Sequence, residues 1–329
     1  MTQVQKLLRN RFISDNNLPF DLIDDPYFVD RLHLVEDTHK GYTKWVELNK
    51  LINDRFDNNM ALFTDVYYNV RNDIVNTMLS TDEYKDFSNG EWFLKFNHAM
   101  PGSPGDRNVY TQEQDGCIFL SVDMKKANFY AMRHFNKDLV FGCDTYEDFI
   151  GKFTDLDYIK NSKYTRQVIY GKLNPKRTMA YERLLVYNFF MECFQPYLDD
   201  NWIWFSLKYD EILIKLLDKS KLGTSQVESF LRERRQYCND WNGIKFGYEL
   251  FKLNSRIFEK EGSMSPLVVF EKEHLYGDKE GQKTLHCVPA TYYPQVYKLL
   301  NGMGVTENDL VFKYEHELAK FLKPLTLKK

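Results

Sequence analysis

Apolar positions in the first 95 residues recur every three or four residues, which is the spacing of an amphipathic helix. The runs KWVELNKLINDRF (44–56) and ALFTDVYYNVRNDIVNTML (61–79) show this spacing most clearly. Residues 98–116 then concentrate Gly, Pro and Asp, which predicts a long, turn-rich loop. The pattern therefore predicts an N-terminal helical region followed by a loop of the length that is often functional.

The middle of the chain changes to the continuous apolar runs of buried strands. CIFLSVDM (117–124) predicts a strand that ends in an acid, followed by a helical run at 126–135. NWIWFSLKYDEILIKL (201–216) predicts two strands joined by an acidic turn. GIKFGYELFKL (243–253) and PLVVFEKE (266–273) predict two further strands.

Between and after these strands the helical spacing returns. Residues 178–194 are apolar over most of a helix circumference and predict a core helix. Residues 224–241 predict an amphipathic helix that stops before Gly243, and residues 307–322 predict a late helix. The fold class expected is α+β, with two or three subdomains in a chain of 329 residues.

Composition supports a packed, folded chain. Hydrophobic residues make up 43%, with 25 Phe and 22 Tyr, which argues against intrinsic disorder. Because no apolar run approaches the 18 residues of a membrane span and the start lacks a secretory signal, we expect a soluble cytoplasmic protein with no membrane contact. The five cysteines stand singly, without the spacing of a zinc site, so most are expected to be small core residues.

The charge of the chain is locally concentrated. A net charge of -3 is unusual for a protein that binds nucleic acid, because phosphate contacts supply most of the non-specific affinity. Residues 160–177 nevertheless hold six basic side chains and no acid, namely Lys160, Lys163, Arg166, Lys172, Lys176 and Arg177. This segment predicts a basic, Gly-containing turn that contacts phosphate.

Asp123 and the pair Asp210 and Glu211 are the acids that interrupt strongly apolar segments. A lone acid at a strand end is often a helix cap, and the pair could form a charged hairpin tip. An unpaired carboxylate in an apolar segment is costly, however, unless a cation or hydrogen bonds neutralise it. A divalent metal would satisfy both positions.

These residues occur in short motifs that resemble those of the right-hand palm polymerases. VDMKKANF resembles the first palm motif, with Asp123 as the metal-binding acid and Asn128 as the residue that inspects the sugar. YGKLNP resembles the second motif, in which Gly171 and then Pro175 open a helix beneath the templating base pair. LKYDEILIKL resembles the third motif, an acidic pair on a hairpin turn. The motifs follow the order of that family.

The spacing of the motifs is similar to that of the reverse transcriptase-like branch, with 48 positions from Asp123 to Gly171 and 39 from Gly171 to Asp210. The acid pair departs from that branch, which usually has two aspartates, and looks more like the string of family A DNA polymerases. Arg166 with Tyr170 and Gly171 also resembles the fingers helix of family A. GIKFGYELFKL resembles a fourth palm motif, with Lys252 near the leaving phosphate.

The resemblance implies a right-hand architecture, with an antiparallel-sheet palm packed on helices. Its expected parts are a helical, fingers-like region at 1–116, a palm at 117–260 with an inserted basic segment at 155–177, and a thumb-like region at 261–329.

The resemblance also implies a template-directed nucleic-acid polymerase. Its cofactor would be Mg²⁺, or Mn²⁺, bound by Asp123, Asp210 and Glu211, and its partners a primer-template and nucleoside triphosphates. The residues expected near the triphosphate are Lys125, Lys126, Arg166 and Lys172, each of which could instead be a solvated helix charge.

Two residues are expected at the base and sugar of the nucleotide. Tyr170 would stack on the nascent base pair, or would belong to the core. Asn128 is smaller than the aromatic that usually excludes ribose, so discrimination against ribonucleotides should be poor. Alternatively, Asn128 caps a turn or faces solvent, and Phe129 or Tyr130 takes that role.

Two other readings remain open from the sequence. One is a catalytically silent palm that binds nucleic acid or serves as an assembly scaffold. The other is a globular structural protein in which the motifs are coincidental. The sequence leaves open the type of template, the need for a primer, the polymerase branch and any protein partners.

Overall fold

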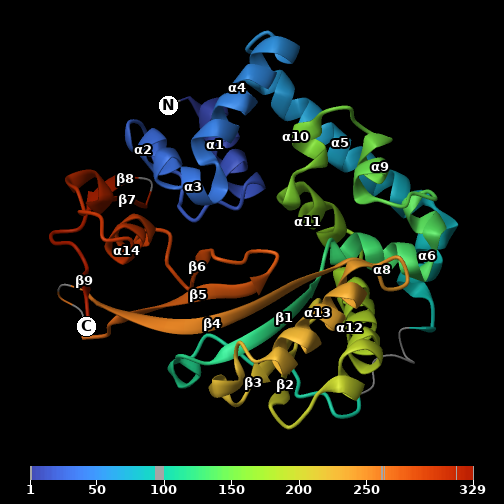
Figure 1. The fold of residues 1–329 in the computed structure, drawn as a ribbon. Coiled ribbons are helices and arrows are strands. Elements are labelled where there is room, and N and C mark those ends of the chain that lie inside the picture. The colour runs from blue at the N-terminus through green and yellow to red at the C-terminus, as the bar shows by residue number, and fades with distance from the viewer. Residues whose placement is uncertain (1, 93–99, 261, 263, 316, 329) are drawn as a thin grey trace.

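The computed structural model describes residues 2–92, 100–260, 262, 264–315 and 317–328 (Figure 1). Helices form the first part of the chain, and an antiparallel sheet with further helices forms the rest. The predicted α+β class is therefore confirmed. Residues 93–95 and 98–99, where the predicted helical region meets the predicted loop, lie outside the described residues.

The N-terminal region is helical, as its apolar spacing predicts. A capping box starts the first helix, because the Thr2 side chain accepts from the Gln5 backbone N–H and Gln5 reaches back to Thr2. The rings of Phe12 and Phe28 pack edge-on against Trp45, with centroids 5.0 and 5.2 Å away. The helices are α1 (Gln3–Asp15), α2 (Tyr27–Leu34), α3 (Glu36–His39), α4 (Gly41–Phe56), α5 (Met60–Ser80) and α6 (Asp82–Asn89).

The basic segment 160–177 is helical, which corrects the predicted turn. Ser162 caps α11 by accepting from the Thr165 backbone N–H, and α12 begins with Pro175, whose fixed φ and missing N–H suit the first helical position. Only residues 172–174 connect the two helices. The helices that follow the first strand are α8 (Ala127–Phe135), α9 (Tyr146–Gly151), α10 (Asp157–Lys160), α11 (Lys163–Gly171), α12 (Pro175–Cys193) and α13 (Ser225–Asn239).

Among the described residues, seven strands form one antiparallel sheet in the order β2-β3-β1-β4-β5-β6, with β9 paired to β4. All four strand segments predicted from the sequence belong to this sheet. Because β5 and β6 continue it, the palm boundary expected at residue 260 falls within the β4–β5 hairpin. The strands are β1 (Ile118–Met124), β2 (Trp202–Leu207), β3 (Glu211–Leu216), β4 (Phe246–Glu259), β5 (Leu267–Gly277), β6 (Lys283–His286) and β9 (Thr326–Leu327).

The two faces of β1 have different surroundings, because successive strand residues point to opposite faces. Leu120 and Val122 belong to the large core, to which α12 contributes Phe189. Figure 1 shows α12 and α13 lying along the sheet. Phe119 faces the other way, into a smaller cluster that Val109 helps to cover. The predicted loop therefore crosses the second face of the sheet.

The C-terminal region corrects the predicted helix at 307–322. A short 3-10 turn is followed by the hairpin of β7 (Val311–Tyr314) and β8 (Glu317–Lys320), after α14 (Tyr293–Leu300). In this arrangement Phe312 stacks on Phe321 with ring centroids 4.2 Å apart, and Tyr292 stacks on Phe321 at 4.6 Å. Aromatic packing outweighs the helical spacing here, a common tertiary override of local propensity.

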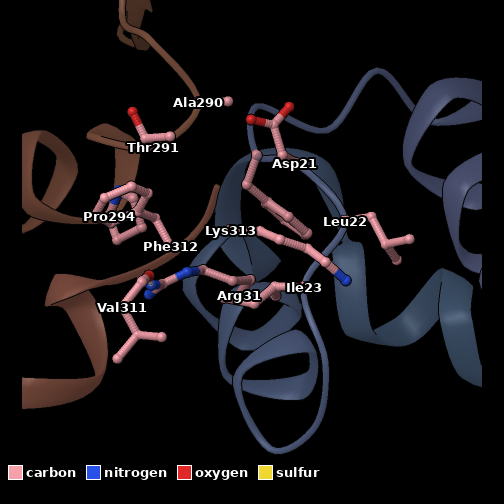
Figure 2. A pocket seen from close by; sticks show the side chains of 11 residues that line it. Asp21, Leu22, Ile23, Arg31, Ala290, Thr291, Pro294, Val311, Phe312 and Lys313 are labelled. Atoms are coloured by element: carbon pink, nitrogen blue, oxygen red, sulfur yellow. Dashed lines mark hydrogen bonds between the residues drawn. The ribbon is translucent and has the colours of Figure 1, made fainter. Parts of the chain in front are cut away.

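The N-terminal helices contact the C-terminal region of the chain (Figure 1). Figure 2 shows Arg31 of α2 extending toward Val311 in the C-terminal segment. Its buried guanidinium donates to Asp309 Oδ1 at 3.3 Å, to the Asn308 carbonyl at 2.9 Å and to the Val311 carbonyl at 3.0 Å. Lys298 Nζ lies 2.6 Å from the second oxygen of Asp309. We call this group the Arg31–Asp309 contact.

The remaining features concern the cysteines and the apolar character of the helices. All five cysteines are free, and Cys143, Cys193 and Cys238 are buried, whereas Cys287 is exposed. Within the described residues, no helix combines the length and the apolar character needed to cross a membrane.

Candidate active site

The end of β1 lies beside the turn of the β2–β3 hairpin. Asp123 is the Cα partner of Glu211 across the two strands, and the Met124 N–H donates to the Asp210 carbonyl at 2.8 Å. The Lys208 N–H donates to the Glu211 carbonyl at 2.9 Å and closes the hairpin turn. The fold thus places Asp123, Asp210 and Glu211 next to one another, from segments 87 and 88 positions apart in the chain.

These carboxylates disfavour one another's ionisation. The Asp123 side chain is exposed to solvent, although neighbouring protein atoms partly desolvate its carboxyl group. That partial burial, with the negative charges of Asp210 and Glu211, raises the pKa of Asp123 to about 7. Burial also raises the pKa of Asp210, and Glu211 adds to the effect. A bound cation would relieve this repulsion, and Asp123 is accessible to one.

Asp123 and Asp210 are the residues of this site that could hold a divalent metal ion. Among the described residues, no three His, Cys, Asp or Glu side chains are grouped so that they could hold a metal ion. Glu211 is already engaged, because its Oε1 accepts from Ser121 Oγ at 2.7 Å and its Oε2 lies 3.9 Å from Lys208 Nζ. Mg²⁺ often binds through one or two carboxylates and completes its shell with water and phosphate. Asp123 and Asp210 suit that mode.

Glu249 of β4 is a further carboxylate that the sequence analysis missed. It is the partner of Ser121, two positions before Asp123, so the three side chains share one face of the sheet. Its charge contributes to the raised pKa of Asp123. Glu249 itself lies 2.8 Å from Lys279 Nζ and 3.4 Å from His274 Nδ1. A glutamate within the apolar run FGYELF was the available signal.

A cleft of about 330 Å³ is lined by Asp123, Glu211 and Glu249. Lys272 of β5 contributes to its wall although its side chain is buried, and burial lowers the pKa of its ammonium while Glu211 and Glu249 oppose that shift. Lys125 is in the wall as well, with its Nζ 2.9 Å from Asp278 Oδ2. The cleft therefore presents acids that could bind a cation beside cations that could bind phosphate.

Two of the predicted residues lie at the start of α8. Lys126 has a left-handed backbone, with a φ of 52°, and its ammonium pairs with Glu147. Asn128 Nδ2 donates to Glu182 Oε1 at 2.5 Å, so its side chain bonds α12 and does not cap the helix. Phe129 and Tyr130, the alternatives for sugar inspection, are core residues.

The residues of the basic segment are dispersed around the surface of α11 and α12. Arg166 lies over the Tyr146 ring, 5.4 Å from its centroid, and Lys172 Nζ donates to Asn72 Oδ1 at 3.3 Å. Gly171 is exposed at the end of α11. Tyr170 is only 2% exposed, which places it in the core and not against a base. Arg166 and Lys172 therefore already have partners within the protein.

Lys163, at the first position of α11, is the basic residue whose charge reaches the acids. It lowers the pKa of both Asp123 and Asp210, against the effects that raise them. Its side chain is exposed. The sequence includes Lys163 among six basic residues but does not single it out, because that choice depends on where the fold places α11 relative to Asp123 and Asp210.

Lys252 is not part of this site. It is the partner of Ile118 on β1, whereas the partner of Asp123 is Gly247, five positions earlier on β4. Strand alternation puts Lys252 on the face opposite to Glu249 and Phe251. The segment of the fourth motif therefore contributes to strand β4, but Lys252 does not line the cleft.

Comparison of the chain with protein-family models, with curated proteins and with solved structures finds no match.

Proposed function

We propose that this chain is a template-directed nucleotidyltransferase of the right-hand palm type. The observation that carries the proposal is the pairing of Asp123 at the end of β1 with the Asp210 and Glu211 turn of the β2–β3 hairpin. In the proposed reaction, the 3′-hydroxyl of a primer attacks the α-phosphorus of a nucleoside triphosphate and pyrophosphate leaves.

Asp123 and Asp210 would hold the divalent metals in this reaction. When bound, Mg²⁺ or Mn²⁺ supplies charge neutralisation for the attacking oxygen and for the triphosphate. Glu211, fixed by Ser121, orients the hairpin turn and adds negative charge to the site. Lys163 and Lys125 are placed to contact triphosphate oxygens, because one influences the acids from α11 and the other lines the cleft.

The architecture supports the same assignment in outline. An antiparallel sheet is covered by α12 and α13 on one face, and the helical N-terminal region and the C-terminal region contact each other through Arg31 and Asp309. These parts would act as palm, fingers and thumb. The α11 helix would be the fingers element that faces the acids.

Nucleotide incorporation by the purified chain tests the proposal. Labelled deoxy- or ribonucleotides would be supplied with DNA and RNA primer-templates in Mg²⁺ or Mn²⁺, and the expected result is template-dependent extension in at least one combination. A chain that binds the primer-template but extends none of them would instead be the catalytically silent scaffold.

A further inference from the structure

Lys272 of β5 holds a buried ammonium group without an acidic partner. The residue is only 7% exposed, and within the described part of the chain its Nζ has no ion pair and no hydrogen bond. Its Nζ lies over aromatic rings instead, 4.2 Å from the ring centroid of Phe251 and 5.7 Å from that of Tyr110. Aromatic faces attract a cation, but they do not replace the hydrogen bonds that an ammonium group loses on burial. The group can therefore still gain energy from an anionic ligand.

The Lys272 side chain forms part of the cleft wall. It lines the same cavity of about 330 Å³ as Asp123, and this volume is within the range of small-ligand sites. Burial lowers the pKa of Lys272, although the charges of Glu211 and Glu249 act in the opposite direction and favour the ammonium form. A cation bound at Asp123 and an anion bound at Lys272 would thus neutralise opposite charges of one cleft.

The other lysines that line the cleft, among the residues described, already have carboxylate partners. Lys125 Nζ lies 2.9 Å from Asp278 Oδ2, and Lys279 Nζ lies 2.8 Å from Glu249 Oε1. An anion that binds either lysine competes with that carboxylate, whereas Lys272 has no ion pair to give up. A contact between charges is also stronger away from water than at an exposed side chain. Lys272 is therefore the lysine of the cleft best suited to bind an anion.

We infer that Lys272 binds a phosphate group in this cleft, carried either by the nucleoside triphosphate or by the backbone of the nucleic-acid strand. β5 lies outside the four motifs of the palm resemblance, so no motif indicated this residue. The inference rests on the proposed function, because phosphate is the anion that both of its substrates bring. Both sources present the same oxyanion, which an ammonium group binds as a point charge.

Isothermal titration calorimetry with two probes tests the inference without catalysis. One probe is inorganic pyrophosphate in Mg²⁺ buffer, and the other is a primer-template without nucleotides in the same buffer. Lys272→Met removes the charge and keeps an apolar chain over the rings. The dissociation constant for one probe should rise by about 10- to 100-fold, the effect of one charge-assisted hydrogen bond. The probe that is affected more strongly identifies the source of the phosphate.

Lys215→Met is the matched control, and both dissociation constants should stay at their wild-type values in it. Lys215 Nζ also lies near an aromatic ring of the sheet, 5.9 Å from the Phe119 centroid, but it donates to Gln114 Oε1 at 2.9 Å. Lys215 is not among the described residues that line the cleft. Lys272→Gln provides a second variant if Lys272→Met does not fold, and the same loss of affinity is expected. Thermal unfolding shows which variants are folded.

Folded Lys272 variants that bind both probes as the wild type does would overturn the inference, because Lys272 would then only balance the charges of Glu211 and Glu249. A wild-type chain that binds neither probe would overturn it as well. The proposed function fails separately, since a chain that binds a probe through Lys272 but extends no primer-template keeps this phosphate site and is not a polymerase.

Discussion

At the scale of single residues, the fold changes the protonation of Asp123 in a way that can be tested by measuring stability against pH. Its pKa rises from 3.8 to about 7, so the folded protein holds this proton at pH values where the unfolded chain has released it. The associated stability is fully present below about pH 4 and is lost as the pH rises through about 7. Without a bound metal, Asp123 therefore destabilises the folded protein most above about pH 7, where its carboxyl group is ionised and able to bind a metal.

Asp123→Asn should remove this loss of stability. In buffer with EDTA, the variant should unfold at a higher temperature than the wild type at pH 8, and the difference should shrink toward pH 4, because the amide has no charge to gain. Thermal unfolding across this range measures it, with Asp73→Asn on the exposed surface of α5 as control. An unchanged or lower unfolding temperature at pH 8 would show that Asp123 is not held in a repulsive site.

At the scale of residues, the sequence could predict the acids but not their neighbours. Asp123 stands out because it lies in an apolar strand, and Asp210 because it lies in the turn between two apolar strands. Glu249 joins them only through the β1–β4 register, and Glu182 only through the packing of α8 on α12. Lys252 was expected at the site but lies on the other face of β4, because a one-residue difference in strand position reverses the face of a side chain.

At the scale of elements, the basic residues of 160–177 are divided among α10, α11, α12 and the turn between α11 and α12, and they have different surroundings. Arg166 and Lys172 already have partners in Tyr146 and Asn72, whereas Lys163 influences the charges of the acids. The helix was predicted as a turn because glycine, asparagine and proline at its end dominate the local pattern. The local spacing of residues 307–322 predicts a helix. The aromatic packing that replaces this helix with a hairpin joins separate positions and cannot be inferred from local spacing.

Lys163→Gln should therefore raise the KM for nucleotide by about tenfold or more, as expected for loss of a charge-assisted hydrogen bond worth about 1.5–3 kcal/mol. Lys172→Gln, which changes the same kind of side chain on the same segment, should have a much smaller effect. Steady-state incorporation with varied nucleotide measures both. Equal effects of the two substitutions would show that Lys163 has no specific role and that the segment acts only as a general basic surface.

At the scale of the whole molecule, the Arg31–Asp309 contact joins the first and last parts of the chain. The two residues are 278 positions apart, and no sequence pattern indicated that they would meet. Both side chains are almost fully buried, at 5% and 4% exposure. The sheet and most helices could be predicted from periodicity, but this closure could not, because it depends on the three-dimensional arrangement of complete regions.

Arg31→Met should lower the free energy of unfolding by about 3 kcal/mol or more, because it leaves Asp309 buried without one of its cations. Lys298 would remain as a partner. The control is Lys85→Met, which breaks the exposed pair with Asp82 and should cost less than about 1 kcal/mol. Chemical denaturation measures both values, and similar losses in the two variants would show that the contact does not stabilise the fold.

The central claim is that Asp123 and Asp210 perform nucleotidyl transfer, and single-turnover incorporation by Asp→Asn variants tests it most directly. On a primer-template that the wild type extends, Asp123→Asn and Asp210→Asn should each abolish extension while still binding the nucleic acid, and Asp73→Asn should extend it as the wild type does. Extension at the wild-type rate by either site variant would contradict the account.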